Sequence, residues 1–406
     1  MKSAKIYSFP DVILAIFISL MGFIVFNWFQ QPLQHELNGL FDANQYQKAY
    51  EFFRGKLETY RVNYPFSVRI FVPWLAAQLP FDNIFTNFKI LNLFFGIAWI
   101  PFWFYLGKKL NLGRFKTWIG WFWINFHWVG IWKANFSDPI TVDLPLYLFQ
   151  LILLLALIES KWWLLWLIAA ISTIQKESIL PILLVLCIYP GISLYRKHDK
   201  KAFGSLLMAL LISYITLKIT SMYFPGANTG KNALVNLFNN TLGLLGHPHL
   251  FLRWICSLTI AYAAFLWVLI WHPKPFLTKP DNRQKLLLPI ILVYGFFSLI
   301  AGGDFTRIAF LGAPFVLLFF LRNLQLSYLQ WIVLLGISLP AMRLFEFIPD
   351  GGADFENWKK WYPEYAPANW LIIFGAYTLL VAVISKIWLK PQNFDLSLKH
   401  KNNKSS

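Results

Sequence analysis

The chain has 406 residues, of which 57% are hydrophobic and only 14% are charged. Soluble globular domains carry about 25% charged residues, so the composition excludes such a domain and indicates a polytopic membrane protein. The formal net charge is +17. Although basic chains often bind nucleic acid, basic cytoplasmic loops account for this charge more simply, and we expect no nucleic-acid partner.

Hydrophobic segments recur along the chain and predict an all-α integral membrane bundle of about twelve spans. The first segment has no small-residue cleavage pattern after it, so we expect it to remain as a span. We expect residues 1–389 to form a single multi-pass domain and residues 390–406 to be a disordered cytoplasmic tail. The expected spans are 11–29, 86–106, 118–132, 144–158, 162–174, 179–194, 202–223, 251–272, 286–301, 308–321, 328–344 and 370–389.

The distribution of charge predicts the orientation. With the N-terminus inside, the cytoplasmic segments hold 21 of the 36 Lys and Arg residues but only five of the 19 Asp and Glu residues. This asymmetry follows the positive-inside rule and predicts that both termini lie in the cytoplasm. We expect the membrane to be a bacterial inner membrane. The long loops (30–85, 224–250 and 345–369) then face outward, and functional sites are commonly built on such loops.

The first outer loop, residues 30–85, carries the first candidate site residues. Residues 43–53 predict an amphipathic helix, and a half-buried apolar element follows. Asp42 stands at the front of this helix, where it could be a catalytic carboxylate or only an N-cap. Arg69 lies within an apolar stretch, and a charge in such surroundings at a membrane surface requires a partner.

Further polar groups recur where the expected spans emerge on the outer side. Asp138 precedes Pro139, so it could be functional or could cap a helix that begins at the proline. Asp143 is expected to pair with Lys133 or Lys176. All of these groups are expected on the outer side, whereas polar groups without a function should occur on both sides, so their common location favours a functional role. The groups are Asn135-Phe136-Ser137-Asp138-Pro139 with Asp143, Gln175-Lys176-Glu177-Ser178, and Gly302-Gly303-Asp304-Phe305-Thr306-Arg307.

Two of these groups also have a purely structural interpretation. Lys176 and Glu177 could form a solvated turn between two spans. Asp304 and Arg307 are three residues apart and could form an ion pair on one helix face.

His247-Pro248-His249 could suggest a metal site, but it lacks a third ligand nearby. The sequence therefore indicates no metal site and no cofactor, although a divalent metal is compatible with it.

Four short motifs resemble those of the GT-C superfamily of membrane glycosyltransferases, which use sugars carried on a polyprenyl phosphate. Many members have a second acid in the first outer loop, whereas here the nearest is Glu36, six residues before Asp42. The chain also lacks a soluble outer domain. The resemblance rests on Phe41-Asp42-Ala43 with Tyr46 and Ala49, Pro65-Phe66-x-x-Arg69-Ile70-x-x-Pro73, Lys176-Glu177-Ser178 and Asp304-x-x-Arg307.

The resemblance implies inverting transfer of a sugar from a polyprenyl phosphate to a lipid-linked or cell-envelope glycan on the extracytoplasmic side. Asp42 would be the base that removes the acceptor proton. Cations would bind the donor phosphate, for which Arg is suited by its bidentate geometry. The residues expected at the phosphate are Arg307, Lys176 and Arg69, and those expected at the substrate are Asp138, Asp143, Glu177 and Asp304.

Three alternatives remain open from the residues alone. The chain could be a polysaccharide polymerase, a lipid or glycan transporter, or a non-catalytic scaffold. Transporters place charges near the bilayer midplane on broken helices. Here the charges within the expected spans lie close to the span ends, and only Lys218 is more than three residues from an end. This distribution favours chemistry at the outer surface.

Overall fold

The computed structural model describes residues 8–37, 39, 41–191, 199–227, 238, 241–243, 246–277, 282–300 and 303–391. Within these residues all regular structure is helical, in agreement with the predicted class. Gly302 and residues 392–406 of the expected tail lie outside the described residues.

The described part of the first half of the chain contains the expected first outer loop and five helices of 13 or more residues. Its elements are α1 (Phe9–Phe29), η1 (His35–Leu37), α2 (Ala43–Phe53), η2 (Phe66–Val68), α3 (Phe71–Gln78), α4 (Ile84–Lys109), α5 (Arg114–Phe126), α6 (Ile131–Ser137), α7 (Asp143–Ile158), α8 (Trp162–Gln175), α9 (Ile179–Leu186) and the π-helical turn η3 (Cys187–Gly191).

The second half alternates long helices with shorter, bent ones. Its elements are α11 (Lys200–Tyr223), α13 (His249–Tyr262), α14 (Ala264–Trp271), α15 (Lys274–Leu277), α16 (Asn282–Ile300), α17 (Phe305–Leu311), α18 (Ala313–Asn323), α19 (Tyr328–Met342), α20 (Phe355–Lys359) and α21 (Ala368–Trp388).

Several of the described helices are suited to a bilayer. Four of them, α1, α4, α11 and α21, are long and apolar enough to cross a membrane, and there are six candidate spans if each of two bent helix pairs counts as one. Shorter apolar helices of 10–17 residues accompany them. The described helices are therefore compatible with a helical membrane protein, but they do not show the full set of twelve expected spans.

Three of the expected continuous spans are broken. Residues 118–132 divide between α5 and α6, which are separate helices. Residues 251–272 turn by 110° between α13 and α14, and α17 and α18 meet at 61° within 308–321. At the first of these bends Ala263 has a φ of 44°. Hydropathy depends only on composition, so it does not detect a change of backbone direction within an apolar run.

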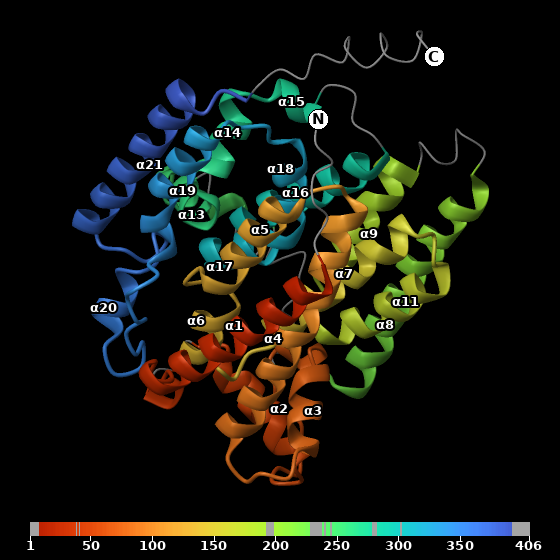
Figure 1. Cartoon of the computed structure of the whole chain (residues 1–406). Helices are drawn as coiled ribbons and strands as arrows, with labels where there is room; N and C mark the ends of the chain where they lie inside the picture. The colour runs from red at the N-terminus through yellow and green to blue at the C-terminus, as the bar shows by residue number, and fades with distance from the viewer. Residues whose placement is uncertain are drawn as a thin grey trace.

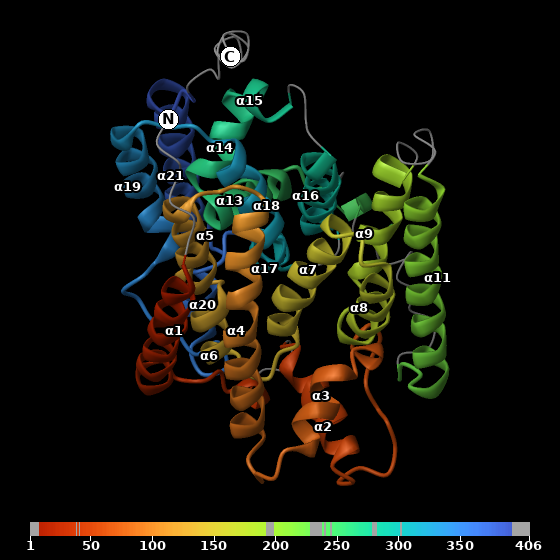
Figure 2. The same ribbon diagram turned by 45° about the vertical axis from the view of Figure 1, so that its right-hand side comes forward.

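The predicted amphipathic helix forms as α2, with the bounds expected from the sequence. Its buried residues are Ala43, Tyr46, Ala49 and Tyr50, which lie on one face because positions three, four and seven apart align on an α-helix. This face packs on α3, and α3 packs on α4. Figures 1 and 2 show α2 and α3 together at one end of the bundle, with α15 at the other end.

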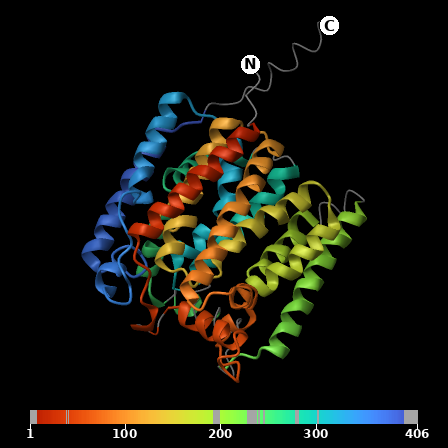
Figure 3. The same ribbon diagram turned by 60° about the horizontal axis from the view of Figure 1, so that its bottom comes forward.

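The remaining helices form two packed groups. In one, α7 lies between α4 and α8, and α8 packs on α11. In the other, α13 contacts α17, α19 and α21. Contacts of α16 with α9 and of α17 with α7 join the groups. Figure 3 shows α11 and α21 on opposite flanks of the molecule.

The last outer loop is hydrogen-bonded to the beginning of the first. Gln30 and Ile348 exchange two hydrogen bonds, of 2.8 and 2.9 Å. Asp350 Oδ1 accepts from the backbone N–H groups of Gln34 and Gly352, both at 2.9 Å. A Cβ atom on Gly352 would lie 2.0 Å from the Gln34 carbonyl oxygen, so this approach requires glycine.

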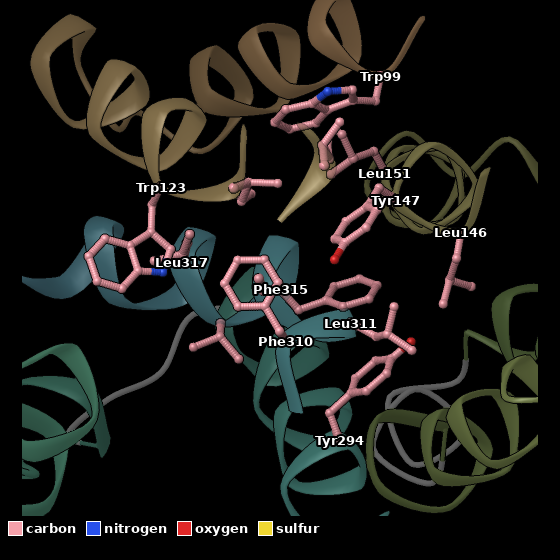
Figure 4. Packing of buried hydrophobic residues seen from close by; sticks show 14 of the residues in the cluster. Trp99, Trp123, Leu146, Tyr147, Leu151, Tyr294, Phe310, Leu311, Phe315 and Leu317 are labelled. Carbon is pink, nitrogen blue, oxygen red and sulfur yellow. The ribbon is translucent and has the colours of Figure 1, made fainter. Parts of the chain in front are cut away.

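A large aromatic core supports this arrangement. Six tryptophans from α4 to α6 and the intervening turn are fully buried: Trp99, Trp103, Trp121, Trp123, Trp128 and Trp132. Figure 4 shows how Tyr147 and Leu311 lie in the same packed region as Phe310 and Phe315. Tyr147 and Leu311 also line the cavity described next, so that cavity rests directly on the core.

Candidate active site

A cavity of about 280 Å³ lies between the outer loops and the ends of α7 and α17. Its lining combines charged and aromatic side chains. The lining residues are Leu33, Phe41, Asp42, Val129, Ala134, Asn135, Ser137, Asp138, Thr141, Asp143, Tyr147, Asp304, Arg307, Leu311, Ile348, Phe355, Trp358, Tyr362 and Tyr365. The cavity therefore draws on segments from both ends of the chain.

Five of the predicted site residues meet at this cavity. Asp42 precedes α2, Asp138 follows α6, and Asp143 is the first residue of α7. Asp304 and Arg307 stand at the start of α17. The sequence predicts that these residues lie on one side of the membrane, and the fold brings them to a single cavity.

Arg307 is the centre of the charged group. Its guanidinium is ion-paired with Asp42, lies 3.2 Å from Asp304 and lies 3.5 Å from Asp143. The Arg307 side chain is only 26% exposed. The ion pair expected between Asp304 and Arg307 is therefore present, but it is one part of a larger network.

Asp42 does not act as a helix cap. Its side chain makes no capping hydrogen bond to α2 and instead faces Arg307. Asp138 likewise does not cap a helix that begins at Pro139, because α7 begins four residues later at Asp143. The interpretation of Asp42 as a side-chain cap of α2, and of Asp138 as the cap of a helix that begins at Pro139, is therefore wrong.

Asp143 connects Arg307 to a second cation. Lys176 Nζ lies 2.5 Å from Asp143 Oδ1, and both side chains are about nine-tenths buried. Of the two partners expected for Asp143, Lys176 is confirmed. Lys133 instead donates to the backbone carbonyls of Arg343, Leu344 and Glu346, so it holds the chain just after α19.

A second ion pair lies behind the cavity. Arg69 contacts Glu177 through two hydrogen bonds, of 2.5 and 2.8 Å, and donates to the Tyr46 hydroxyl at 3.0 Å. Burial by itself raises the pKa of Glu177, but Arg69 outweighs burial and holds that pKa below its ordinary value. The Lys176–Glu177 turn is therefore covered by the first outer loop rather than solvated.

Three predicted site residues do not line the cavity. Arg69, Lys176 and Glu177 are absent from its wall, and each is paired with an opposite charge. Arg307 is the one Lys or Arg among the lining residues, facing four aspartates. The described wall is therefore acidic.

This charge balance affects Asp138 most clearly. Burial raises the pKa of Asp138 to about 7; Asp42, Asp143 and Asp304 add to the rise, and Arg307 opposes it. Crowding of like charges in a poorly solvated site disfavours the ionised form in this way.

The last outer loop forms an aromatic wall of the cavity. The Trp358 ring lies 4.4 Å from that of Tyr362 and 5.5 Å from those of Phe355 and Tyr365. The Tyr365 hydroxyl donates to Asp304, which connects this wall to the charged group. The sequence did not indicate that residues 345–369 belong to the site.

Glu364 is a supporting residue that the sequence did not indicate. Its carboxylate accepts from the N–H and hydroxyl of Thr306, at 2.9 and 2.8 Å, and from Ser257 at 2.9 Å. These bonds attach the last outer loop to the first turn of α17, next to Arg307. Burial raises the pKa of Glu364 to about 7, against the hydrogen bonds from Thr306 that lower it. A single glutamate between Pro363 and Tyr365 carries no signal for this contact.

Among the described residues, no group of three or more His, Cys, Asp or Glu side chains is placed to hold a metal ion. The four aspartates of the wall contact cations or line the cavity without forming such a group. Comparison of the chain with protein-family models, curated proteins and solved structures finds no match.

Proposed function

We propose that the protein is a membrane glycosyltransferase that moves a sugar from a polyprenyl phosphate to a lipid-linked or cell-envelope glycan. The observation that carries the proposal is the convergence of Asp42, Asp138, Asp143, Asp304 and Arg307 on one cavity. Carboxylates suit the recognition of sugar hydroxyls and the removal of a proton, and an arginine suits a phosphate. The proposal includes twelve spans, cytoplasmic termini and an extracytoplasmic cavity in a bacterial inner membrane.

In this proposal Arg307 binds the donor phosphate. Because its guanidinium already contacts three carboxylates, the phosphate would replace one of them when the donor binds. Arg69 and Lys176 would act from behind the wall, by holding Glu177 and Asp143 in place. The aromatic wall would supply apolar faces for a sugar ring.

Transfer would follow an inverting course. The acceptor hydroxyl attacks the anomeric carbon, the phosphate leaves on the opposite face, and a carboxylate of the cavity takes the hydroxyl proton. Asp42, the base predicted from the sequence, and Asp138 are both on the wall.

A transporter is the second candidate, because one observation favours it. Transporters bind their substrates at broken helices, and Arg307 stands at the head of the bent pair α17–α18. Against this candidate, the charged groups gather at helix ends near the outer loops rather than along the middle of the bundle.

The test uses the protein in lipid vesicles with a panel of labelled polyprenyl-phosphate sugars and a crude glycan acceptor. We expect wild type to transfer label to the acceptor. Arg307→Ala should weaken donor binding about ten- to a hundredfold, since a charge-assisted contact contributes about 1.5–3 kcal/mol. Arg61→Ala is the matched control, because Arg61 is an exposed arginine of the first outer loop.

Transfer of label would distinguish an enzyme from a transporter, which would move the lipid across the vesicle without changing it. If wild type transfers no sugar from any donor of the panel, the proposed function is wrong. If Arg307→Ala binds the donor as tightly as Arg61→Ala does, the phosphate site is wrong.

A further inference from the structure

The two carboxylates available as bases differ in their partners. Asp42 is ion-paired with Arg307, so an oxygen of its carboxylate is already engaged by a guanidinium. Asp138 lines the same cavity, and no hydrogen bond or ion pair joins its carboxylate to any residue in the described part of the chain. It follows the C-terminal end of α6, where its own backbone N–H bonds to Ala134, so the backbone that carries it is held.

The surroundings of Asp138 also favour a proton acceptor. The charged groups that face it are Arg307 from α17, Asp42 ahead of α2, Asp143 from α7 and Asp304 ahead of α17. With three carboxylates and one cation nearby, an ionised Asp138 gains a proton readily. A general base is most effective when its pKa lies near the working pH, and burial places that of Asp138 at about 7.

We propose that Asp138, rather than Asp42, accepts the proton of the acceptor hydroxyl, and that Asp42 holds Arg307 in place for the donor phosphate. This inference rests on the proposed function. In the step, the acceptor oxygen forms a bond to the anomeric carbon. The bond from that carbon to the phosphate oxygen breaks, its electron pair leaves with the phosphate, and the hydroxyl proton moves to the Asp138 carboxylate.

The experiment compares Asp138→Asn, Asp138→Glu and Asp42→Asn in the vesicle assay, with transfer followed as a function of pH. Asp82→Asn is the control, because Asp82 is an exposed carboxylate of the first outer loop. Binding of a polyprenyl phosphate without sugar is measured separately for each variant.

We expect Asp138→Asn to lower transfer at saturating donor by at least about a hundredfold, the usual effect of losing a general base, while polyprenyl-phosphate binding is retained. In wild type, kcat/KM should fall as the pH drops below about 7, since a base acts only when deprotonated. We call this decline the acidic limb of the pH profile. Asp42→Asn should weaken lipid-phosphate binding and keep this acidic limb. Asp138→Glu should recover part of the transfer that Asp138→Asn loses.

Near-wild-type transfer by Asp138→Asn, in a preparation where wild type is active, would overturn this inference and leave the proposed function standing. Loss of the acidic limb in Asp42→Asn with its retention in Asp138→Asn would return the base to Asp42. If Asp138→Asn does not fold, an Asp138→Glu variant without an altered acidic limb overturns the inference. Wild type without any transfer overturns both proposals together.

Discussion

The ion pair between Arg69 and Glu177 makes the sharpest test of how the first outer loop is held. It joins η2 to the turn between α8 and α9, with side chains 10% and 23% exposed. We predict that Arg69→Met leaves Glu177 buried without its cation. Breaking a buried pair by removing one partner costs about 3–5 kcal/mol, and we expect the lower end because Glu177 is partly exposed.

Hydrogen exchange of α2 and α3 measures this cost locally. About 3 kcal/mol corresponds to roughly a hundredfold faster exchange, since every 1.4 kcal/mol is a factor of ten. The exchange should accelerate in α2 and α3, because these helices open with the loop, and not in α21, which packs on α13, α14 and α19. Arg61→Met is the matched control and should leave exchange unchanged.

The double variant Arg69→Met with Glu177→Gln removes both charges. It should cost less than the sum of the two single changes, because neither partner is then left as an uncompensated charge. If the two costs add, or if Arg69→Met leaves exchange of α2 unaltered, the pair does not hold the loop. The pKa of Glu177 is depressed, so the pair should stabilise the loop above the unfolded-state value and lose this effect as the pH falls through the lower folded-state value.

Two further predictions concern orientation and pH. Cysteines in place of Asp82 and Asn357, both exposed, should react with an impermeant thiol reagent outside the cell, whereas one in place of Lys108, exposed in the last turn of α4, should not; reaction of the Lys108 variant alone would reverse the proposed topology. The pKa of Glu364 is raised from 4.5 to about 7, so the folded state binds the extra proton between these values and its stability should fall as the pH rises through them. Glu364→Gln does not titrate and should remove this part of the slope in thermal unfolding, and an unchanged slope would contradict the assignment.

Local structure was largely determined by the sequence. The bounds of α2 follow from one amphipathic face that includes Tyr46 and Tyr50. Such a face can be recognised in the sequence because its apolar residues are three or four positions apart. The start of α7 at Asp143 and the extent of α11 follow from apolar runs bounded by polar residues. The sequence also identified Asp42 and Arg307 as unusual charges, because acids and cations among apolar segments are costly unless they have a partner or a function.

Only the tertiary structure decided which of these charges meet. Asp42 and Arg307 are 265 residues apart, and no local pattern specifies a contact across that separation. The same applies to the bend at Ala263 and to the burial of Lys176 and Arg69 away from the cavity. Helix packing determines which side chains face a common space, and that packing depends on the whole chain. For this reason the three cations that were all predicted to bind the donor phosphate divide into one that lines the cavity and two that lie outside its lining.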